Sequence, residues 1–349
     1  MIAARLYGRE DLRIEEIPLP VPGAGEVQVR VAYAGLCGTD LHEYFGGPRA
    51  TTTPHPLTGA VLPQILGHEL SGTVTELGPG TASVRIGDRV CVRPIYHCGE
   101  CPRCVVGLTH LCARGAAVGV SAPGGGLAGY LVVPQHLVFG LPDEVSLVRG
   151  ALVEPMSTAL NAVLRAGCVP GERAVVFGAG AVGHGVLLSL AALGVGEVAV
   201  VEPSPLRRAA AEALGATRTV DPAGDPVAEV LDWTGGRGVD AAFECAGRES
   251  SLAAAIGGTA AQGRLVILAL FDGSVPIPMD VLRRAELSML GAQTCPRPVF
   301  ERVIELMAAG HYPAEGWVEH IPLSDVVAGL ADIRDGRRGK VLVDLSSVL

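Results

Sequence analysis

Residues 173–183 read RAVVFGAGAVG and join an apolar stretch to a turn that contains three glycines. Ala174–Phe177 is typical of a buried β-strand, and residues 181–194, AVGHGVLLSLAALG, are typical of an apolar helix. The first glycine permits a tight turn, the second lets the backbone approach a pyrophosphate, and the third lets helix and strand pack closely. Because the amino terminus of the helix faces the phosphate charge, we predict a dinucleotide-binding turn formed by Gly178, Gly180, Val182 and Gly183.

An acidic residue, Glu202, ends the next apolar stretch, VAVVEP, nineteen residues after Gly183. A carboxylate at this place accepts hydrogen bonds from the adenosine ribose of NAD and repels the 2′-phosphate of NADP. Arg207 follows closely and is a further predicted coenzyme contact, and with Arg208 beside it NADP stays in consideration. A glycine-rich turn without a nucleotide is the alternative, which the agreement of strand, helix and acid disfavours. The pattern therefore favours NAD.

The chain of 349 residues is long enough for two domains. Residues 156–293 alternate apolar strands with helical stretches, which predicts a βαβ series and a doubly wound α/β domain. Residues 1–155 contain short β-like runs separated by Gly and Pro, such as EVQVRVAYAG and GYLVVPQHLVF, and predict a β-rich barrel or sandwich. Residues 294–349 return through one helix and a final strand, and we expect them to complete the first domain.

Composition and charge exclude several classes of protein. With 27 basic and 36 acidic residues the net charge is -9, and the absence of a long Lys/Arg run disfavours nucleic acid as a partner. The apolar runs are shorter than the roughly 18 residues of a membrane span, and the amino terminus lacks a secretion signal, so we expect a cytoplasmic protein. Lys340 is the only lysine and lies in a turn before the last strand, which disfavours short-chain and lysine-dependent aldo-keto reductases.

Four of the nine cysteines fall within fifteen residues in the segment CGECPRCVVGLTHLC. Their spacing is C-x2-C-x2-C-x7-C, which suits a closed, tetrahedral zinc site that is structural because it has no open position for a substrate. An iron–sulfur cluster and disulfides are the alternatives; a reducing cytosol disfavours disulfides. The predicted structural zinc ligands are Cys98, Cys101, Cys104 and Cys112.

Other potential metal ligands are dispersed: Cys37 in GLCGTDLHEY, His68 and Glu69 in LGHELSG, and Glu154 in ALVEPMST. No short-range spacing rule links them. The segment His68-Glu69 is not followed by a second histidine four residues later, so it is not an HExxH protease helix. Spacing alone favours a core cysteine, a surface histidine and ordinary acids.

A resemblance changes this interpretation. These segments, with the cysteine loop, GAGAVG and VVEPS, resemble the zinc-containing medium-chain dehydrogenase/reductase family from end to end. The segments HEYFGGP and PIYHCGECPRC are most similar to (R,R)-2,3-butanediol dehydrogenases, with sorbitol and L-threonine 3-dehydrogenases as near relatives. The resemblance implies a chaperonin-like β-barrel catalytic domain, a Rossmann domain, a homodimer or homotetramer, NAD, and one catalytic and one structural zinc per chain.

The resemblance also assigns roles to single residues. It implies that Cys37, His68 and Glu154 bind the catalytic zinc, Glu154 standing where other alcohol dehydrogenases have a second cysteine. Glu69 matches a nearby acid that can approach the metal. Thr39 and His42 match the proton relay of the family. Thr158 matches a residue that lies beside the nicotinamide.

The implied reaction is hydride transfer between NAD and a secondary alcohol or vicinal diol of the 2,3-butanediol/acetoin type. We hypothesise that a carboxylate ligand makes the zinc more oxygen-loving and favours diols. A sorbitol-like polyol dehydrogenase and an L-threonine 3-dehydrogenase are the alternatives within the family. A non-enzymatic zinc- or nucleotide-binding redox sensor is the alternative from another class, and the relay residues argue against it because a sensor does not need them.

Overall fold

The computed structural model describes residues 1–348, which divide into two compact units. The first unit is Met1–Glu154, Pro296–Ala314 and Val318 onward, and the second is Pro155–Cys295 with Glu315–Trp317. These limits differ by one or two residues from the domain limits expected from the sequence, and they add residues 315–317 to the second unit. No helix within residues 1–348 is long and apolar enough to cross a membrane.

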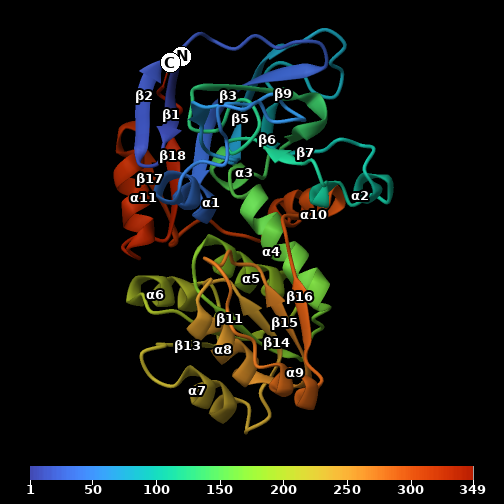
Figure 1. Cartoon of the computed structure of the whole chain (residues 1–349), viewed down its shortest axis with the longest axis vertical. Coiled ribbons are helices and arrows are strands. Elements are labelled where there is room, and N and C mark those ends of the chain that lie inside the picture. The colour runs from blue at the N-terminus through green and yellow to red at the C-terminus, as the bar shows by residue number, and fades with distance from the viewer. Residues whose placement is uncertain (349) are drawn as a thin grey trace. The chain divides into compact units, whose positions relative to one another are not determined.

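The first unit is built mainly of β-strands (Figure 1). A seven-stranded sheet has the order β10-β6-β5-β3-β18-β17, with β9 also paired to β3; smaller sheets have the orders β2-β1-β4 and β7-β8. The strands are β1 (Ile2–Gly8), β2 (Asp11–Glu16), β3 (Glu26–Leu36), β4 (Gln64–Ile65), β5 (Glu69–Leu77), β6 (Arg89–Val92), β7 (Ile95–Tyr96), β8 (Ala116–Ala117), β9 (Tyr130–Pro134), β10 (Val138–Gly140), β17 (Val318–Pro322) and β18 (Lys340–Asp344).

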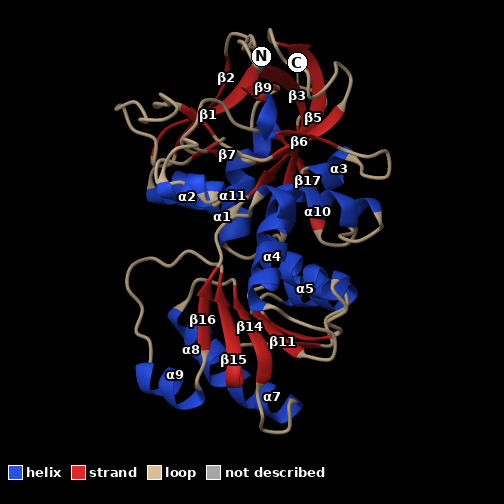
Figure 2. Ribbon diagram, turned by 90° about the vertical axis from the view of Figure 1, so that its right-hand side faces the viewer, coloured by secondary structure: helices blue, strands red, loops and turns tan. Residues whose placement is uncertain are grey.

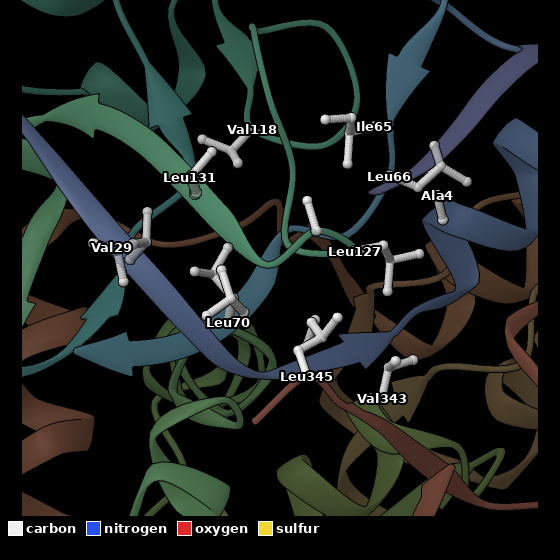
Figure 3. Close-up of a cluster of buried hydrophobic side chains, with 14 of the residues drawn as sticks. Ala4, Val29, Ile65, Leu66, Leu70, Val118, Leu127, Leu131, Val343 and Leu345 are labelled. Carbon is white, nitrogen blue, oxygen red and sulfur yellow. The ribbon is translucent and has the colours of Figure 1, made fainter. Parts of the chain in front are cut away.

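Strand β3 is the centre of this unit because it pairs with β5 along one side and with β9 and β18 along the other. Val27, Val29 and Val31 alternate with polar residues and are at most 1% exposed, as expected for β-branched residues on the buried face of a strand. Figure 3 shows apolar side chains from β3, β5, β9 and β18 packed together in this core. The C-terminal strand β18 pairs antiparallel with β3, so the tail is part of this sheet.

Short helices connect the strands of the first unit. Two longer ones, α10 (Arg297–Ala308) and α11 (Val326–Arg334), come from the C-terminal part of the chain. The others are α1 (Gly38–Leu41), the π-helix η1 (His42–Gly46), α2 (Pro102–Val105), η2 (Thr109–Leu111), η3 (Gln135–Leu137), α3 (Leu147–Gly150) and η4 (Leu323–Asp325).

The second unit has one six-stranded sheet whose neighbouring strands are all parallel (Figure 2). Its order is β13-β12-β11-β14-β15-β16, the doubly wound order of dinucleotide-binding domains. The strands are β11 (Arg173–Phe177), β12 (Glu197–Val201), β13 (Arg218–Val220), β14 (Val239–Glu244), β15 (Thr259–Ile267) and β16 (Ser288–Gly291). The helices are α4 (Val153–Ala166), which begins at the unit boundary, α5 (Ala181–Ala192), α6 (Pro205–Ala213), α7 (Pro226–Trp233), α8 (Glu249–Gly258) and α9 (Met279–Ala285).

Helices cover both faces of this sheet, as a parallel sheet requires. One apolar cluster joins α4, α5 and α6 to one face of the strands, and a second joins α7 and α8 to the other face. The two clusters use alternate residues of β11: Ala174 and Val176 on one side, Val175 and Phe177 on the other. The predicted Rossmann domain is therefore confirmed.

Candidate metal centres and coenzyme site

Strand register brings Cys37, His68 and Glu69 together in the first unit. Cys37 follows β3 and is the residue before α1, whereas His68 immediately precedes β5. In the antiparallel pair β3·β5, Gly35 lies opposite Glu69, so the end of one strand and the start of the other meet. One potential ligand atom from each of the three residues lies within 4.8 Å of the others. Three residues that lie far apart in the sequence therefore form a candidate metal site.

Asp40 connects the two loops of this site, a role that was not predicted from the sequence. Its buried carboxylate accepts hydrogen bonds from the backbone N–H of Cys37, at 2.9 Å, and of Gly67, at 3.1 Å. Asp40 Oδ1 also lies 3.9 Å from His68 Nδ1. The available signal was its position three residues after Cys37 at the start of a short helix, where acids accept such bonds.

The buried atoms at this site that lack a hydrogen-bond partner fit the ligands of a metal ion. His68 Nδ1 and Glu69 Oε1 are buried and have no hydrogen-bond partner among the described residues. Burial raises the pKa of the Cys37 thiol, and the nearby Glu69 raises it further. Burial lowers the pKa of His68, but the negative charges of Cys37, Asp40 and Glu154 outweigh it and raise that pKa well above its usual value. A thiolate, an imidazole and carboxylates are the ligands that zinc prefers.

Lys340, which was expected in a turn before the last strand, is buried next to this site. It opens β18, is 1% exposed, donates from Nζ to the carbonyl oxygen of Leu36 at 2.9 Å, and forms an ion pair with Glu69. Gly35 leaves the necessary room, since a Cβ there would lie 2.0 Å from Glu69 Oε2 and 2.8 Å from Lys340 Nζ. The signal that could have found this role was that the chain contains a single lysine.

The remaining residues predicted for catalysis lie on helices. Glu154 is the second residue of α4 and is half-buried, and its charge acts on His68. The compact group of ligand atoms contains Glu69 and not Glu154, so the zinc ligation by Glu154 stays a prediction. Thr39 on α1 and His42 at the start of η1 are half-buried, and their relay role also stays a prediction.

The structure brings the four loop cysteines together as the spacing predicts. Measured between sulfur atoms, Cys98 lies 3.5 Å from Cys112 and 3.9 Å from Cys104, and Cys101 lies 3.9 Å from Cys112. Four sulfurs at about 2.3 Å from one zinc ion would be about 3.8 Å apart, so the loop fits this metal. Backbone N–H groups, the largest contribution coming from Glu100, lower the pKa of Cys98 to about 5 and favour its thiolate, whereas burial raises the pKa of Cys104 to about 12.

The glycine-rich turn of the second unit has the predicted geometry. Gly178 adopts a φ of +92° directly after β11, and a Cβ there would lie 3.1 Å from Ala246, which follows β14. The turn therefore lies where the strand order reverses, the usual ligand position in such sheets. A Cβ on Gly183 would lie 1.8 Å from the Gly178 carbonyl oxygen, whereas one on Gly180 would meet no atom within 4 Å. Gly183 is needed for packing, and Gly180 leaves space open.

The other predicted coenzyme residues lie in the same unit. Glu202 is 3% exposed, and its carboxylate accepts hydrogen bonds from Ala179 N, at 2.7 Å, and Ser204 N, at 2.9 Å. The first of these bonds attaches the acid to the glycine-rich turn. Three further predicted coenzyme residues are half-buried: Val182 on α5, Arg207 on α6 and Thr158 on α4. Their coenzyme contacts stay predictions.

The chain matches two protein families. Residues 23–143 match the alcohol dehydrogenase GroES-like domain, and residues 181–309 match the zinc-binding dehydrogenase family. The (R,R)-butanediol dehydrogenase of Bacillus subtilis (strain 168) is 40% identical over 337 residues, 94% of each chain. The 2-dehydro-3-deoxy-L-galactonate 5-dehydrogenase of Pseudoalteromonas atlantica is 35% identical over 99% of each chain.

A solved structure agrees with these matches. The crystal structure of 2R,3R-butanediol dehydrogenase from Bacillus subtilis superimposes with a TM-score of 0.91 at 38% identity, over 98% of this chain and 99% of that one. Sorbitol and L-threonine 3-dehydrogenases are also among the relatives. The two units and their candidate sites define a zinc-type alcohol dehydrogenase. The chain belongs to the zinc-containing medium-chain dehydrogenase/reductase family, which confirms the resemblance and the expected fold and makes the protein an oxidoreductase.

Proposed function

We propose that the protein oxidises a secondary alcohol or vicinal diol of the 2,3-butanediol type with NAD, and reduces the matching hydroxyketone. The observation that carries the proposal is the group of Cys37 with the buried His68 and Glu69, in which His68 Nδ1 and Glu69 Oε1 have no hydrogen-bond partner among the described residues. The 40% identity to a butanediol dehydrogenase supports this substrate class. A sorbitol-like or threonine dehydrogenase is the second candidate, supported by relatives of those names.

The proposed roles of the residues follow from their chemistry. Cys37, His68 and Glu154 would hold a zinc ion, which supplies Lewis-acid chemistry that lowers the pKa of a substrate hydroxyl. Asp40 would orient the loops of Cys37 and His68 through its two backbone hydrogen bonds. The Thr39 hydroxyl would accept the substrate proton, and His42 would pass it toward solvent, since imidazole exchanges protons near neutral pH. Carboxylates in place of a second thiolate favour oxygen-rich diols.

The second unit would bind NAD. Gly178, Gly180, Val182 and Gly183 would surround the pyrophosphate at the amino terminus of α5, and Glu202 would accept hydrogen bonds from the adenosine ribose. Arg207 and Thr158 would contact the remainder of the coenzyme. NAD is preferred over NADP because the Glu202 carboxylate would repel a 2′-phosphate.

We further propose two zinc ions per chain, the second bound by Cys98, Cys101, Cys104 and Cys112. A homodimer or homotetramer is supported by the family resemblance and by β16, which ends its sheet and presents an edge for pairing. We also propose a cytoplasmic location, because the four loop cysteines must stay reduced to bind zinc, as they do in a reducing compartment.

The test is a substrate panel on the zinc-loaded protein, with NAD reduction followed by absorbance. The panel contains the stereoisomers of 2,3-butanediol, sorbitol, L-threonine and primary alcohols, each with NAD and with NADP. We expect the highest kcat/KM for a 2,3-butanediol isomer with NAD. Equal kcat/KM for primary alcohols and vicinal diols would contradict the diol preference, and a higher value for sorbitol or threonine would select the second candidate.

A further inference from the structure

Arg208, on α6, is held by three groups at the end of the predicted coenzyme strand. Its Nη1 donates to the carbonyl oxygens of Glu202, at 2.6 Å, and Pro203, at 2.9 Å. Its Nη2 forms an ion pair with the Asp221 carboxylate at 3.0 Å. The Arg208 side chain is only 20% exposed. The guanidinium is therefore directed at the main chain of Glu202 and at Asp221.

Asp221 lies beside Glu202 because of the register of two parallel strands. Val201 of β12 pairs with Val220 of β13, so Glu202 and Asp221 are the first residues beyond their strands at the same edge of the sheet. Glu202 N donates to the Val220 carbonyl oxygen at 3.0 Å, which extends the pairing to this edge. Ligands bind at the carboxyl edge of such sheets, so Asp221 belongs to the surroundings of the predicted adenosine ribose site.

The Asp221 side chain is itself oriented by its own turn. Its Oδ1 accepts a hydrogen bond from Ala223 N at 3.0 Å, and its Oδ2 is the atom that pairs with Arg208. The two carboxylate oxygens therefore have different partners. Oδ1 stabilises the turn after β13, and Oδ2 pairs with the charge of Arg208.

A dinucleotide with a 2′-phosphate requires a free cation at this place. Phosphate monoesters carry about −1.5 to −2 charges near pH 7 and bind best to an arginine whose N–H groups are available. Arg208 is one of the two arginines close to Glu202 in the sequence, and its terminal nitrogens already have partners. We propose that Asp221 is a coenzyme-specificity residue that pairs with Arg208 and withholds its guanidinium from the 2′-phosphate of NADP.

This inference rests on the proposed binding of a dinucleotide, and it adds a determinant to the expected preference for NAD. Two contributions act in the same direction: the Asp221 carboxylate repels a phosphate, and the ion pair occupies Nη2 of Arg208, the terminal nitrogen that the main-chain carbonyls leave available. Only the second depends on Arg208, so variants can separate them. The substitution D221N is suitable because the amide oxygen can still accept from Ala223 N, whereas the amide nitrogen offers no negative charge to Arg208.

The experiment measures the Kd of NADH and NADPH by nicotinamide fluorescence on the full zinc-loaded chain, without substrate. For D221N we expect roughly tenfold tighter NADPH binding, NADH binding within about twofold of wild type, and a rise in the NADP/NAD ratio of kcat/KM. The matched control is E229Q, which removes the acid paired with Arg218 in the same unit at a similar exposure. It should leave both Kd values unchanged.

The double variant D221N/R208M decides between the two contributions. Loss of the NADPH gain in this variant supports the proposal, whereas a gain that persists without Arg208 would overturn it in favour of simple repulsion by Asp221. D221N that keeps the wild-type Tm and NADH affinity but shows no change for NADPH would also overturn it. A wild-type protein that binds neither dinucleotide would instead contradict the proposed function itself. D221S repeats the test if D221N lowers the Tm.

Discussion

Lys340 and Glu69 form an ion pair in which both side chains are at most 1% exposed, next to the predicted zinc ligand His68. The same Nζ also donates to the carbonyl oxygen of Leu36, the residue before Cys37. Lys340, the only lysine of the chain, thus contacts Leu36 and Glu69, which are adjacent in sequence to the predicted zinc ligands Cys37 and His68. Gly35 provides the space for this pair.

We expect K340M to destabilise the zinc-loaded protein by about 3–5 kcal/mol, because it leaves the Glu69 carboxylate buried without its cation. The measurement is urea-induced unfolding followed by circular dichroism. The double variant K340M/E69Q, which removes both charges, should recover part of the loss. A K340M protein as stable as wild type would contradict the importance of the pair.

The two glycines of the turn should behave differently when changed to alanine. G183A should lower the free energy of unfolding by roughly 1–3 kcal/mol, because its Cβ would lie 1.8 Å from the Gly178 carbonyl oxygen. G180A should keep the wild-type Tm, because its Cβ meets no atom within 4 Å, but should weaken NADH binding about tenfold or more by obstructing the pyrophosphate. Equal Tm values for the two variants would refute the packing role of Gly183.

Replacing one loop cysteine should remove one zinc ion and leave the other. We expect C104S to bind one zinc per chain where the wild type binds two, as measured by inductively coupled plasma mass spectrometry. The control is C91S, a buried cysteine of β6 outside both candidate metal sites, which should keep two. If C104S still carries two zinc ions, the loop is not a zinc site.

We expect the burial of His184 to lower the free energy of unfolding in mild acid. Burial lowers the pKa of His184 to about 4, below the usual value near 6.5 expected for the unfolded chain. The unfolded state therefore takes up the proton first, and stability that is full above pH 6.5 falls between pH 6.5 and 4, by roughly 3 kcal/mol in total. H184Q should flatten this part of the stability curve, whereas H311Q at an exposed position should not. Parallel curves for H184Q and wild type would contradict the assignment.

The features predicted well from the sequence are local ones. The glycines of the turn lie close together in the sequence, and so do the four loop cysteines. The spacing within each group is therefore enough to predict its local geometry. The position of Glu202 at the end of the next strand was also predicted, because the length of one helix and strand sets its distance from the glycines; its contact with the ribose stays a prediction. These residues fix the Rossmann unit and the candidate structural zinc site.

The features that were missed depend on long-range packing. Lys340 lies 271 residues from Glu69 in the sequence, and only the pairing of β18 with β3 and of β3 with β5 brings them together. Cys37 and His68 were grouped through family resemblance, because no spacing rule links the ends of two paired strands. The burial of His184 in the apolar helix α5, with its Nε2 3.4 Å from the Arg207 carbonyl oxygen, likewise depends on tertiary packing.

The central claim is that the protein is a zinc-dependent, NAD-linked diol dehydrogenase. The most direct test measures NADH formation from (R,R)-2,3-butanediol by the purified protein, by the same protein after removal of zinc with a chelator, and after zinc is added back. We predict activity in the first sample, loss in the second and recovery in the third. An undiminished rate in the zinc-free sample, or no NADH from any diol with a protein that carries two zinc ions and binds NADH, would contradict the claim.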